Sequence, residues 1–452
     1  MSNIINSLGV HIPEVLLPNK VVDMTKWSVV ACDQYTSQPE YWTNVEEIVG
    51  DSPSTLKITL PEVYLEEEDK EERINKINGT MKRYLSENIL SLQKPGFIFV
   101  DRKTSHTESR KGLIIAVDLE EYDYNKGSQT LIRATEGTVI ERLPPRIKIR
   151  ENASIELPHI MLLIDDPERS VIEPLSQITN KLEKLYDFDL MMMGGHIKGY
   201  RVDDESLIAG IIEALGKLAD PEVFKSKYEV YNEKGILLFA VGDGNHSLAS
   251  AKAFWDNLKK GLPEEERPTH PSRYALVEVV NVHDEGLIFE PIHRVVFNID
   301  AVSLLDSTVQ YYNSKGSKTH YITFDSEAQM FSELEKLPPS RKVHTIPFIT
   351  SQFYGLMEVE NPGYNLEVGT LQCFLDEYVK HDKNIKIDYI HGDEVVRSLG
   401  AQEGNIGFFL PAMNKCDLFK TVILDGALPR KTFSMGEADE KRFYLECRKI
   451  VK

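Results

Sequence analysis

Residues 235–253, GILLFAVGDGNHSLASAKA, combine an apolar run, a Gly-Asp-Gly-Asn-His turn and the start of a helical pattern. The apolar residues 236–241 predict a buried strand, because a run this short between glycines is too brief for a typical helix. After the turn, Leu248, Ala251 and Trp255 recur at helical spacing. The stretch therefore predicts a strand, a tight turn and a helix, a unit typical of α/β folds.

The predicted turn has the chemistry of an anion site. It leads into a helix N-terminus, where unpaired N–H groups and the helix dipole favour negative charge, and its glycines permit close backbone approach and positive φ. Asn245 and His246 supply hydrogen-bond donors, Asp243 can receive a proton or contact a cation, and Asp243 and His246 are catalytic candidates. The predicted phosphate ligands are Gly242, Gly244, Asn245, Ser247, Arg142 and Arg146. The alternative is an ordinary loop in which Asp243 or Asn245 caps the helix.

A second polar cluster lies upstream, in residues 134–151, ATEGTVIERLPPRIKIRE. Because Pro144 and Pro145 cannot continue a helix, we expect this piece to be extended, with side chains projecting into a cleft. Glu136 is the candidate general base, and Thr138 is a candidate pocket residue. The alternative for Glu136 is a solvated surface carboxylate, the usual state of a glutamate.

Together with the turn and this cluster, other stretches resemble one bacterial and archaeal family, the domain of unknown function numbered 1015. They are WSVVACDQYTSQPEYW at 27–42, LIFEPIHRVV at 287–296, DYIHGDEVV at 388–396 and LPRKTFSMGEADEKRFYLE at 428–446. The family name carries no activity. The matches add possible pocket residues, which are Asp33, Gln34, Tyr35, His293 and Arg294.

The central third also resembles the chromosome-partitioning ParB and sulfiredoxin superfold. A similar strand-turn-helix binds nucleotide phosphates there, and some relatives are free-serine kinases with an early Glu as base, which implies that role for Glu136. This chain departs from these patterns. Thr135 and Asn245 stand where histidine is usual, and Ser247 stands where arginine is usual, which removes a bidentate phosphate ligand.

The leading hypothesis is a small-molecule phosphotransferase. It would transfer phosphate from a nucleotide or pyrophosphate, with Mg²⁺, to a hydroxyl compound such as free serine. The alternative is a nucleotide-binding regulatory or interaction protein without turnover, which the missing arginine at position 247 favours. A third possibility is a metal-assisted hydrolase using His246, Asp243 and a cluster at His391, Asp393 and Glu394. A turn followed by a capped helix explains that last cluster equally well, and we assign no metal ligands.

Composition restricts the partners and the compartment. The formal net charge of −19 disfavours nucleic acid and anionic membrane surfaces. No apolar run approaches the roughly 18 residues that span a bilayer. The widely spaced Cys32, Cys373, Cys416 and Cys447 form no zinc or disulfide pattern. We therefore expect a cytoplasmic protein with reduced thiols; the sequence leaves the oligomeric state open.

The predicted fold is mixed α/β, with a central twisted sheet that carries the turn at its edge and a C-terminal α/β domain. We expect an N-terminal α/β region at 1–130, a ParB/sulfiredoxin-like region at 131–297 and the C-terminal domain at 298–452. Helices are expected from about residue 66 to 85, at 173–185, 206–217 and 327–337, a polar loop at 338–341, and a charged and aromatic helix in 430–446. Strands are expected at 97–100, 113–117, 160–164 and 275–280, with a further strand ending near His293.

Overall fold

The computed structural model describes residues 5, 7–36, 38–65, 67–230, 234–338 and 342–452. The chain forms two compact units, Met1–Ile288 with Met435–Lys452, and Phe289–Ser434. The last residues of the chain thus belong to the first unit. Glu66 and most of the loop expected at 338–341 lie outside the described residues, and the three-region division stays a prediction.

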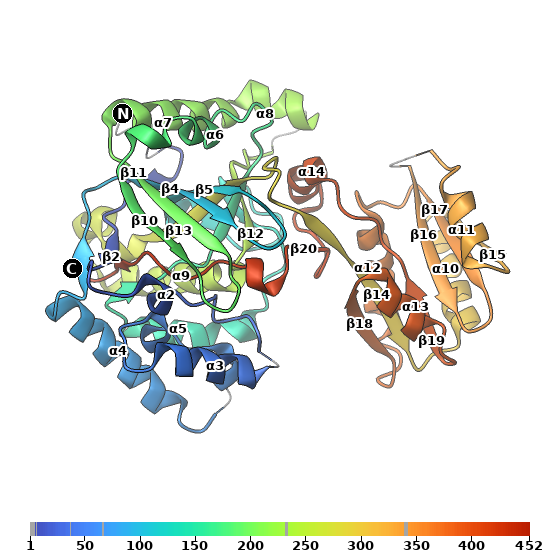
Figure 1. Cartoon of the computed structure of the whole chain (residues 1–452). Coiled ribbons are helices and arrows are strands. Elements are labelled where there is room, and N and C mark those ends of the chain that lie inside the picture. Colours follow the sequence, from blue (N-terminus) through green and yellow to red (C-terminus); the bar gives the residue numbers. More distant parts are fainter. Residues whose placement is uncertain (1–4, 6, 37, 66, 231–233, 339–341) are drawn as a thin grey trace. The chain divides into compact units, whose positions relative to one another are not determined.

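The first unit is built on one large mixed sheet (Figure 1). Its order is β10-β11-β4-β5-β13-β9-β12-β7-β6, and β1 pairs with β5. The strands are β1 (Val10–His11), β4 (Phe97–Lys103), β5 (Arg110–Asp118), β6 (Tyr122–Asp123), β7 (Ile132–Ala134), β9 (Met161–Ile164), β10 (Lys184–Asp189), β11 (His196–Val202), β12 (Phe239–Asp243) and β13 (Tyr274–Asn281). Two short pairs complete the unit, β2 (Leu16–Pro18) with β3 (Leu90–Leu92), and β8 (Ile155–Glu156) with β21 (Arg448–Lys449).

Helices lie on both sides of this sheet, with α7 and α8 on one side and α3, α4 and α5 on the other (Figure 1). The α-helices are α2 (Met24–Trp27), α3 (Pro39–Val49), α4 (Lys70–Ser86), α5 (Leu143–Glu151), α6 (Glu173–Ser176), α7 (Glu205–Leu218), α8 (Pro221–Tyr228) and α9 (Asn245–Leu258). The 3₁₀ turns are η1 (Thr55–Ile58), η2 (Glu62–Tyr64), η3 (Leu119–Glu121), η4 (Ile140–Arg142), η5 (Thr179–Lys181), η6 (Lys259–Gly261), η7 (Glu264–Thr269), η8 (Pro271–Arg273) and η9 (Ala438–Glu440).

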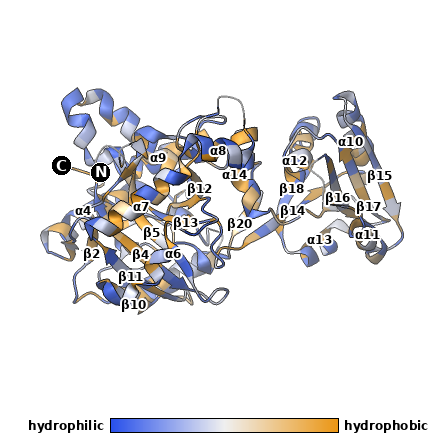
Figure 2. Ribbon diagram, turned by 90° about the horizontal axis from the view of Figure 1, so that it is seen from above, coloured by the Kyte–Doolittle hydropathy of each residue, from blue (hydrophilic) through white to orange (hydrophobic). Residues whose placement is uncertain are grey.

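Alternating side chains of the sheet enter two cores, as the period of a strand requires. Phe97 and Phe99 pack in a cluster that also holds the buried faces of α7 and α9. Ile98 and Val100 point into the other cluster, which contains α3 and residues 443–445 of the C-terminal segment. Figure 2 shows hydrophobic residues concentrated in these strands and hydrophilic residues on the outer faces of the helices.

The second unit carries a sheet of order β15-β17-β16-β19-β14-β18, with β20 pairing β14. Its elements are β14 (Phe289–Phe297), α10 (Ala301–Ser314), β15 (Lys318–Phe324), α11 (Glu327–Leu334), β16 (Val343–Thr350), β17 (Tyr354–Glu360), α12 (Glu367–Tyr378), β18 (Lys386–His391), α13 (Asp393–Gly400), β19 (Asn405–Phe408), α14 (Lys415–Asp425) and β20 (Phe433–Met435). The predicted mixed α/β fold with a second sheet domain is confirmed.

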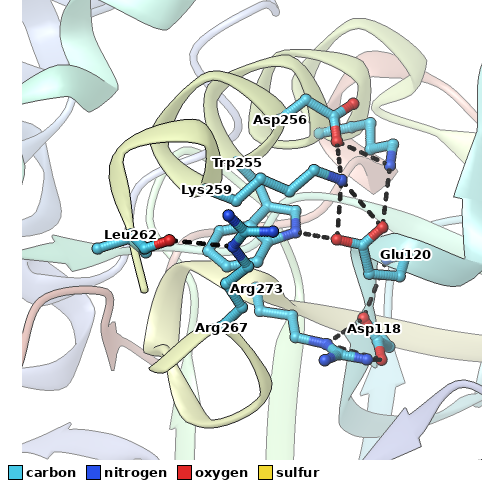
Figure 3. Close-up of polar contacts among 9 residues, drawn as sticks. Asp118, Glu120, Trp255, Asp256, Lys259, Leu262, Arg267 and Arg273 are labelled. Carbon is cyan, nitrogen blue, oxygen red and sulfur yellow. Dashed lines mark hydrogen bonds and ion pairs between the residues drawn. The ribbon is translucent and has the colours of Figure 1, made fainter. Parts of the chain in front are cut away.

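The signature helix α9 is anchored at its far end by a polar network (Figure 3). Trp255 Nε1 donates to Glu120 Oε1 at 2.7 Å, and Lys259 Nζ lies 2.9 Å from the same oxygen. Lys259 also pairs with Asp256 at 2.6 Å. These contacts fix α9 to η3 and so hold its N-terminus at the end of β12.

The structure corrects the expectation that two prolines keep residues 143–151 extended. Leu143–Glu151 form α5, with proline in the first turn. Proline is favourable there because the first N–H groups of a helix have no intrahelical partner and the fixed φ suits the helix. The expected cleft-lining strand is therefore a helix, which packs on α9.

Other boundaries also differ from expectation. The helix expected at 173–185 is a short α6 and a 3₁₀ turn, followed by β10, which pairs with β11. The helix expected in 430–446 is absent from that described segment, which contains β20 and η9 and then passes into the core as extended chain. The strand expected to end near His293 continues to Phe297. The turn was expected at the edge of the sheet, but β12, which leads into it, is an internal strand between β9 and β7.

Candidate functional site

The predicted strand-turn-helix is present, but the strand expected at 236–241 is β12 at Phe239–Asp243, and the turn is shorter than expected because α9 already begins at Asn245. Gly244 joins them with φ of 80°, a left-handed conformation that glycine adopts without strain. The N-cap residue of α9 is Gly244, which makes no side-chain cap bond, so neither Asp243 nor Asn245 is the N-cap that the alternative expected. The first turn of α9 therefore presents backbone N–H groups at the positive end of the helix dipole.

Gly242 and Gly244 are required for different structural reasons. A Cβ on Gly242 would lie 2.8 Å from Leu163 Cγ and 2.9 Å from Met435 Cε. Gly242 therefore serves close packing inside the sheet, while Gly244 serves the turn itself.

Two segments far apart in sequence meet at this turn. The Thr135 N–H donates to Asn245 Oδ1 at 3.2 Å, and the Thr135 hydroxyl donates to the Val241 carbonyl at 2.6 Å. The Val139 N–H donates to His246 Nε2 at 3.3 Å. Residues 135–139, which include Glu136 and Thr138, thus lie beside the N-terminus of α9.

Thr135 and Asn245, two positions at which the chain departs from the motifs it resembles, contact each other. Besides the N–H bond, Asn245 Nδ2 donates to Thr135 Oγ1 at 3.4 Å. A threonine and an asparagine here hold the turn against the Glu136 segment without adding a titratable group. The Thr138 hydroxyl oxygen in that segment is buried and has no hydrogen-bond partner in the described structure.

Asp243 is paired with a cation that the sequence-based site omitted. Lys441 Nζ lies 3.3 Å from Asp243 Oδ2, and Asp243 Oδ1 accepts the Gly244 N–H at 2.9 Å. Lys441 comes from the C-terminal segment and is largely buried. It was visible in the sequence only as one charge of an expected surface helix, so no local signal assigned it to the turn.

Ser247 is hydrogen-bonded to His159, a second residue that the sequence analysis did not include in the site. The distance between Ser247 Oγ and His159 Nε2 is 2.9 Å. Asp33 Oδ2 lies 4.0 Å from the same nitrogen. Burial raises the pKa of Asp33, but the charge of His159 and the hydrogen bond from Gln34 outweigh this effect and hold that pKa below its ordinary value. Asp33 thus joins the turn through His159.

The remaining pocket candidates near the N-terminus have structural partners. Gln34 Nε2 donates to Asp33 Oδ1 at 3.0 Å, and the Gln34 carbonyl accepts the Trp42 indole N–H at 3.2 Å. Tyr35 stacks on Tyr41 with ring centroids 3.7 Å apart.

The predicted arginine ligands are placed by α5. Arg142 is exposed at the start of the helix, and its carbonyl accepts from Arg146 Nη1 at 2.7 Å. The Arg146 guanidinium forms an ion pair with Glu62. Since a carboxylate already balances it, Arg146 supplies less net positive charge than the sequence suggested.

His293 and Arg294 belong to the second unit, where both are buried. His293 Nδ1 accepts the Leu410 N–H at 3.0 Å, and its Nε2 lies 2.9 Å from Asp393 Oδ1. Burial lowers the pKa of His293. Arg294 Nε donates to Gln372 Oε1 at 2.7 Å, and its other nitrogens donate to backbone carbonyls. These bonds give both residues a role in the packing of that unit.

β18 ends at His391 and α13 begins at Asp393, so this motif is a turn leading into a helix. Among the described residues, no group of three or more His, Cys, Asp or Glu side chains has the arrangement of a metal site. No described helix combines the length and the apolar character needed to cross a membrane.

Comparison with known proteins gives one family and several distant structures. A family model described as "Protein of unknown function (DUF1015)" matches residues 16–378. No curated protein matches the chain.

The solved structures include a conserved hypothetical protein from Pyrococcus furiosus, with 12% identity and a TM-score of 0.34, covering 74% of this chain and 90% of that one. A free serine kinase in complex with AMP, the relative expected from the sequence, has 11% identity and a TM-score of 0.35, covering 75% and 91%. SbnI from Staphylococcus aureus has 9% identity and a TM-score of 0.32, covering 72% and 83%. TM-scores this low establish no shared function.

Proposed function

The chain belongs to the DUF1015 family, as its motifs predict, and from that premise we propose that it binds the phosphates of a nucleotide or pyrophosphate at residues 242–247 and transfers a phosphoryl group to a small hydroxyl compound. One observation carries the proposal. The bonds from Thr135 to Asn245 and from Val139 to His246 hold the Glu136 segment beside a helix N-terminus whose N-cap is a glycine. A carboxylate base and an anion site are the two elements that such a transfer requires.

In this proposal the turn and its neighbours divide the tasks. Backbone N–H groups of α9 bind the phosphate oxygens, and Lys441, which is paired with Asp243, would offset part of their charge. Glu136 accepts the proton of the acceptor hydroxyl as the acceptor oxygen bonds to phosphorus and the bond from phosphorus to the donor oxygen breaks. Mg²⁺ is normally held by one or two carboxylates together with substrate phosphates, and Asp243 would be its carboxylate ligand in place of the ion pair with Lys441.

A second candidate is nucleotide binding without turnover, and a specific observation favours it. The position where arginine is usual holds Ser247, whose hydroxyl is engaged by His159. Arg146 is paired with Glu62. With fewer cations directed at the phosphates, transition-state charge is less well stabilised, whereas ground-state binding to backbone N–H groups remains.

Thermal shift with ADP, ATP and pyrophosphate, with and without Mg²⁺, tests binding, because a ligand of the native state raises the apparent Tm by mass action. ³¹P NMR with ATP and L-serine then tests transfer. Binding with phosphoserine formation supports the first candidate, and binding alone supports the second. An unchanged Tm at millimolar ligand contradicts both.

The turn is tested by Gly244→Val, with Gly127→Val as the control. Both glycines have φ of 80°, but a Cβ at Gly244 meets the Ile160 backbone at 3.0 Å, whereas Gly127 has open space around it. We expect Gly244→Val to abolish phosphate binding and Gly127→Val to retain it. Gly244→Ala, with circular dichroism as a check of folding, serves if the valine variant does not fold. Unchanged affinity in a folded Gly244 variant would mean that the turn is only a connection.

A further inference from the structure

Ser247 and His159 have the geometry of a nucleophile and its general base. Ser247 Oγ lies 2.9 Å from His159 Nε2, within the range for proton transfer through a hydrogen bond. His159 is only 7% exposed, so its ring does not rotate freely into solvent. Ser247 lies in the first turn of α9, near backbone N–H groups that favour a developing negative charge, and His159 reaches it from the segment before β9.

The partners of Tyr444 determine which nitrogen of His159 carries the proton. The Tyr444 phenol oxygen accepts the Cys32 N–H at 3.2 Å and donates its own proton to Cys32 Sγ at 3.0 Å. A lone pair of this oxygen therefore faces His159 Nδ1, which is 3.0 Å away. His159 then donates from Nδ1 and keeps the lone pair of Nε2 for the Ser247 hydroxyl. Tyr444 is thus a positioning residue.

Asp33 supplies a negative charge that stabilises the protonated ring of His159. Its Oδ2 lies 4.0 Å from His159 Nε2, close enough to stabilise the ring when it takes the serine proton. The arrangement thus contains a hydroxyl, an oriented imidazole and a nearby carboxylate. It differs from a Ser-His-Asp triad, because Nδ1 of the imidazole faces Tyr444 and the carboxylate lies on the Nε2 side.

A cavity of about 160 Å³ lies beside the pair. Its lining includes Ser247, His159, Tyr444 and Cys32, several apolar side chains such as Leu60, Met81, Ile149 and Leu157, and the charged side chains of Glu62, Arg146, Arg150 and Glu156. An apolar cavity of about 150 Å³ accommodates a group the size of benzene. The cavity therefore fits a small apolar group whose reactive carbon lies near Ser247.

We infer that the chain has a second, nucleophilic activity in which Ser247 accepts a small apolar acyl group from an ester. Ser247 Oγ bonds to the ester carbonyl carbon while its proton passes to His159 Nε2, and the carbonyl electron pair moves to oxygen. The tetrahedral intermediate then breaks its bond to the alcohol oxygen, which leaves with the proton from His159. Water attacks the acyl-serine in the same way, releasing the carboxylic acid and restoring Ser247.

This activity uses neither Glu136 nor a phosphate donor, so it is separable from the proposed phosphoryl transfer. A fluorophosphonate probe is the direct test, because it reacts with activated serine hydroxyls by losing fluoride. Peptide mapping should place the phosphonate on Ser247. Ser250 is the internal control, because it borders the same cavity but donates to the His246 carbonyl at 2.7 Å and lacks a base.

Substitutions test the roles of Ser247, His159 and Tyr444. Ser247→Ala removes the nucleophile, and His159→Gln removes the base while keeping a polar group; both should lower labelling at least a hundredfold. Tyr444→Phe keeps the ring and removes the oxygen that orients His159. It should lower kcat for p-nitrophenyl butyrate about tenfold with little change in KM, whereas mere loosening of the cavity would change KM.

Ester hydrolysis gives the second readout. The unmodified protein should release p-nitrophenol from the butyrate ester with an initial burst, and much less from the palmitate ester, whose chain exceeds the cavity. Fluorescence of the three tryptophans, which all lie in the first unit, shows whether each variant is folded. Absence of phosphonate on Ser247 in the unmodified folded protein overturns the inference, as does equal labelling of Ser250 or full labelling in a folded His159→Gln variant.

Discussion

The backbone N–H of Val139 donates to Nε2 of His246 at 3.3 Å, across a sequence separation of 107 residues. A neutral imidazole that accepts at Nε2 carries its proton on Nδ1. His246 Nε2 thus accepts a backbone hydrogen bond, and the proposed base is the Glu136 carboxylate. The same bond fixes the segment that carries Glu136.

The first prediction concerns Glu136. Glu136→Gln keeps the size of the side chain and removes the proton acceptor, so turnover should fall by about 10² to 10⁴ while donor affinity changes little. Initial rates with ATP and L-serine, and calorimetric titration with ADP, measure the two quantities. Glu141→Gln, an exposed carboxylate of the same segment, is the matched control. A Glu136→Gln variant with normal turnover would remove Glu136 from the mechanism.

The second prediction concerns the ion pair between Lys441 and Asp243. Removing the cation with Lys441→Met should weaken pyrophosphate binding about tenfold, because one charge-assisted contact contributes about 1.5 kcal/mol or more. The loss should shrink at high salt. Lys449→Met, at an exposed position of β21, should leave affinity unchanged. Equal affinity in both variants would mean that Lys441 only anchors the C-terminal segment.

The third prediction concerns pH and the second unit. His344 of β16 is 1% exposed, and burial lowers its pKa to about 4. Below pH 6.5 the unfolded chain therefore binds a proton that the folded unit does not, so stability falls as pH decreases and the loss is complete near pH 4. At pH 5 the loss is about 2 kcal/mol.

Hydrogen exchange of β16 amides at pH 7 and pH 5, corrected for intrinsic exchange, measures this change. His344→Gln removes the titrating group and should flatten the difference between the two pH values. If the unmodified protein and the variant lose the same stability, the acid sensitivity originates in other groups.

Hydrophobic periodicity and turn residues were sufficient to predict those helices and strands whose sequence patterns are strong. The apolar run before Gly242 and the helical spacing after it correctly predicted β12 and α9. The error at Pro144 and Pro145 has a physical reason. Proline is disfavoured in the interior of a helix but is favourable in the first turn. The sequence alone does not say on which side of the prolines the helix lies.

The position of the candidate site was predictable where its residues are contiguous and unpredictable where they meet through the fold. Asp243 and Asn245 belong to a turn motif that is visible in the sequence. His159 precedes β9 without any motif of its own, and Lys441 reaches the turn because residues 435–452 return to the first unit. Such long-range contacts leave no periodic or spacing signal in the sequence.

The fourth prediction concerns the buried charges that hold this returning segment. Arg442 Nη1 donates to Glu278 Oε2 at 2.7 Å, and Arg442 also pairs with Glu446. All three side chains are at most 2% exposed. Despite the cost of burial, the two carboxylates hold the pKa of Arg442 above its ordinary value. Arg442→Met leaves both carboxylates buried without their partner, which should cost about 3 to 5 kcal/mol.

Urea unfolding followed by tryptophan fluorescence measures this loss, because Trp27, Trp42 and Trp255 all lie in the first unit. Combining Arg442→Met with Glu278→Gln and Glu446→Gln removes the unpaired charges and should recover much of the lost stability. A single variant as stable as the unmodified protein would contradict the prediction. Since Lys441 is the neighbour of Arg442, a destabilised single variant should also bind pyrophosphate less tightly, and the triple variant should regain that affinity as the segment returns to its place.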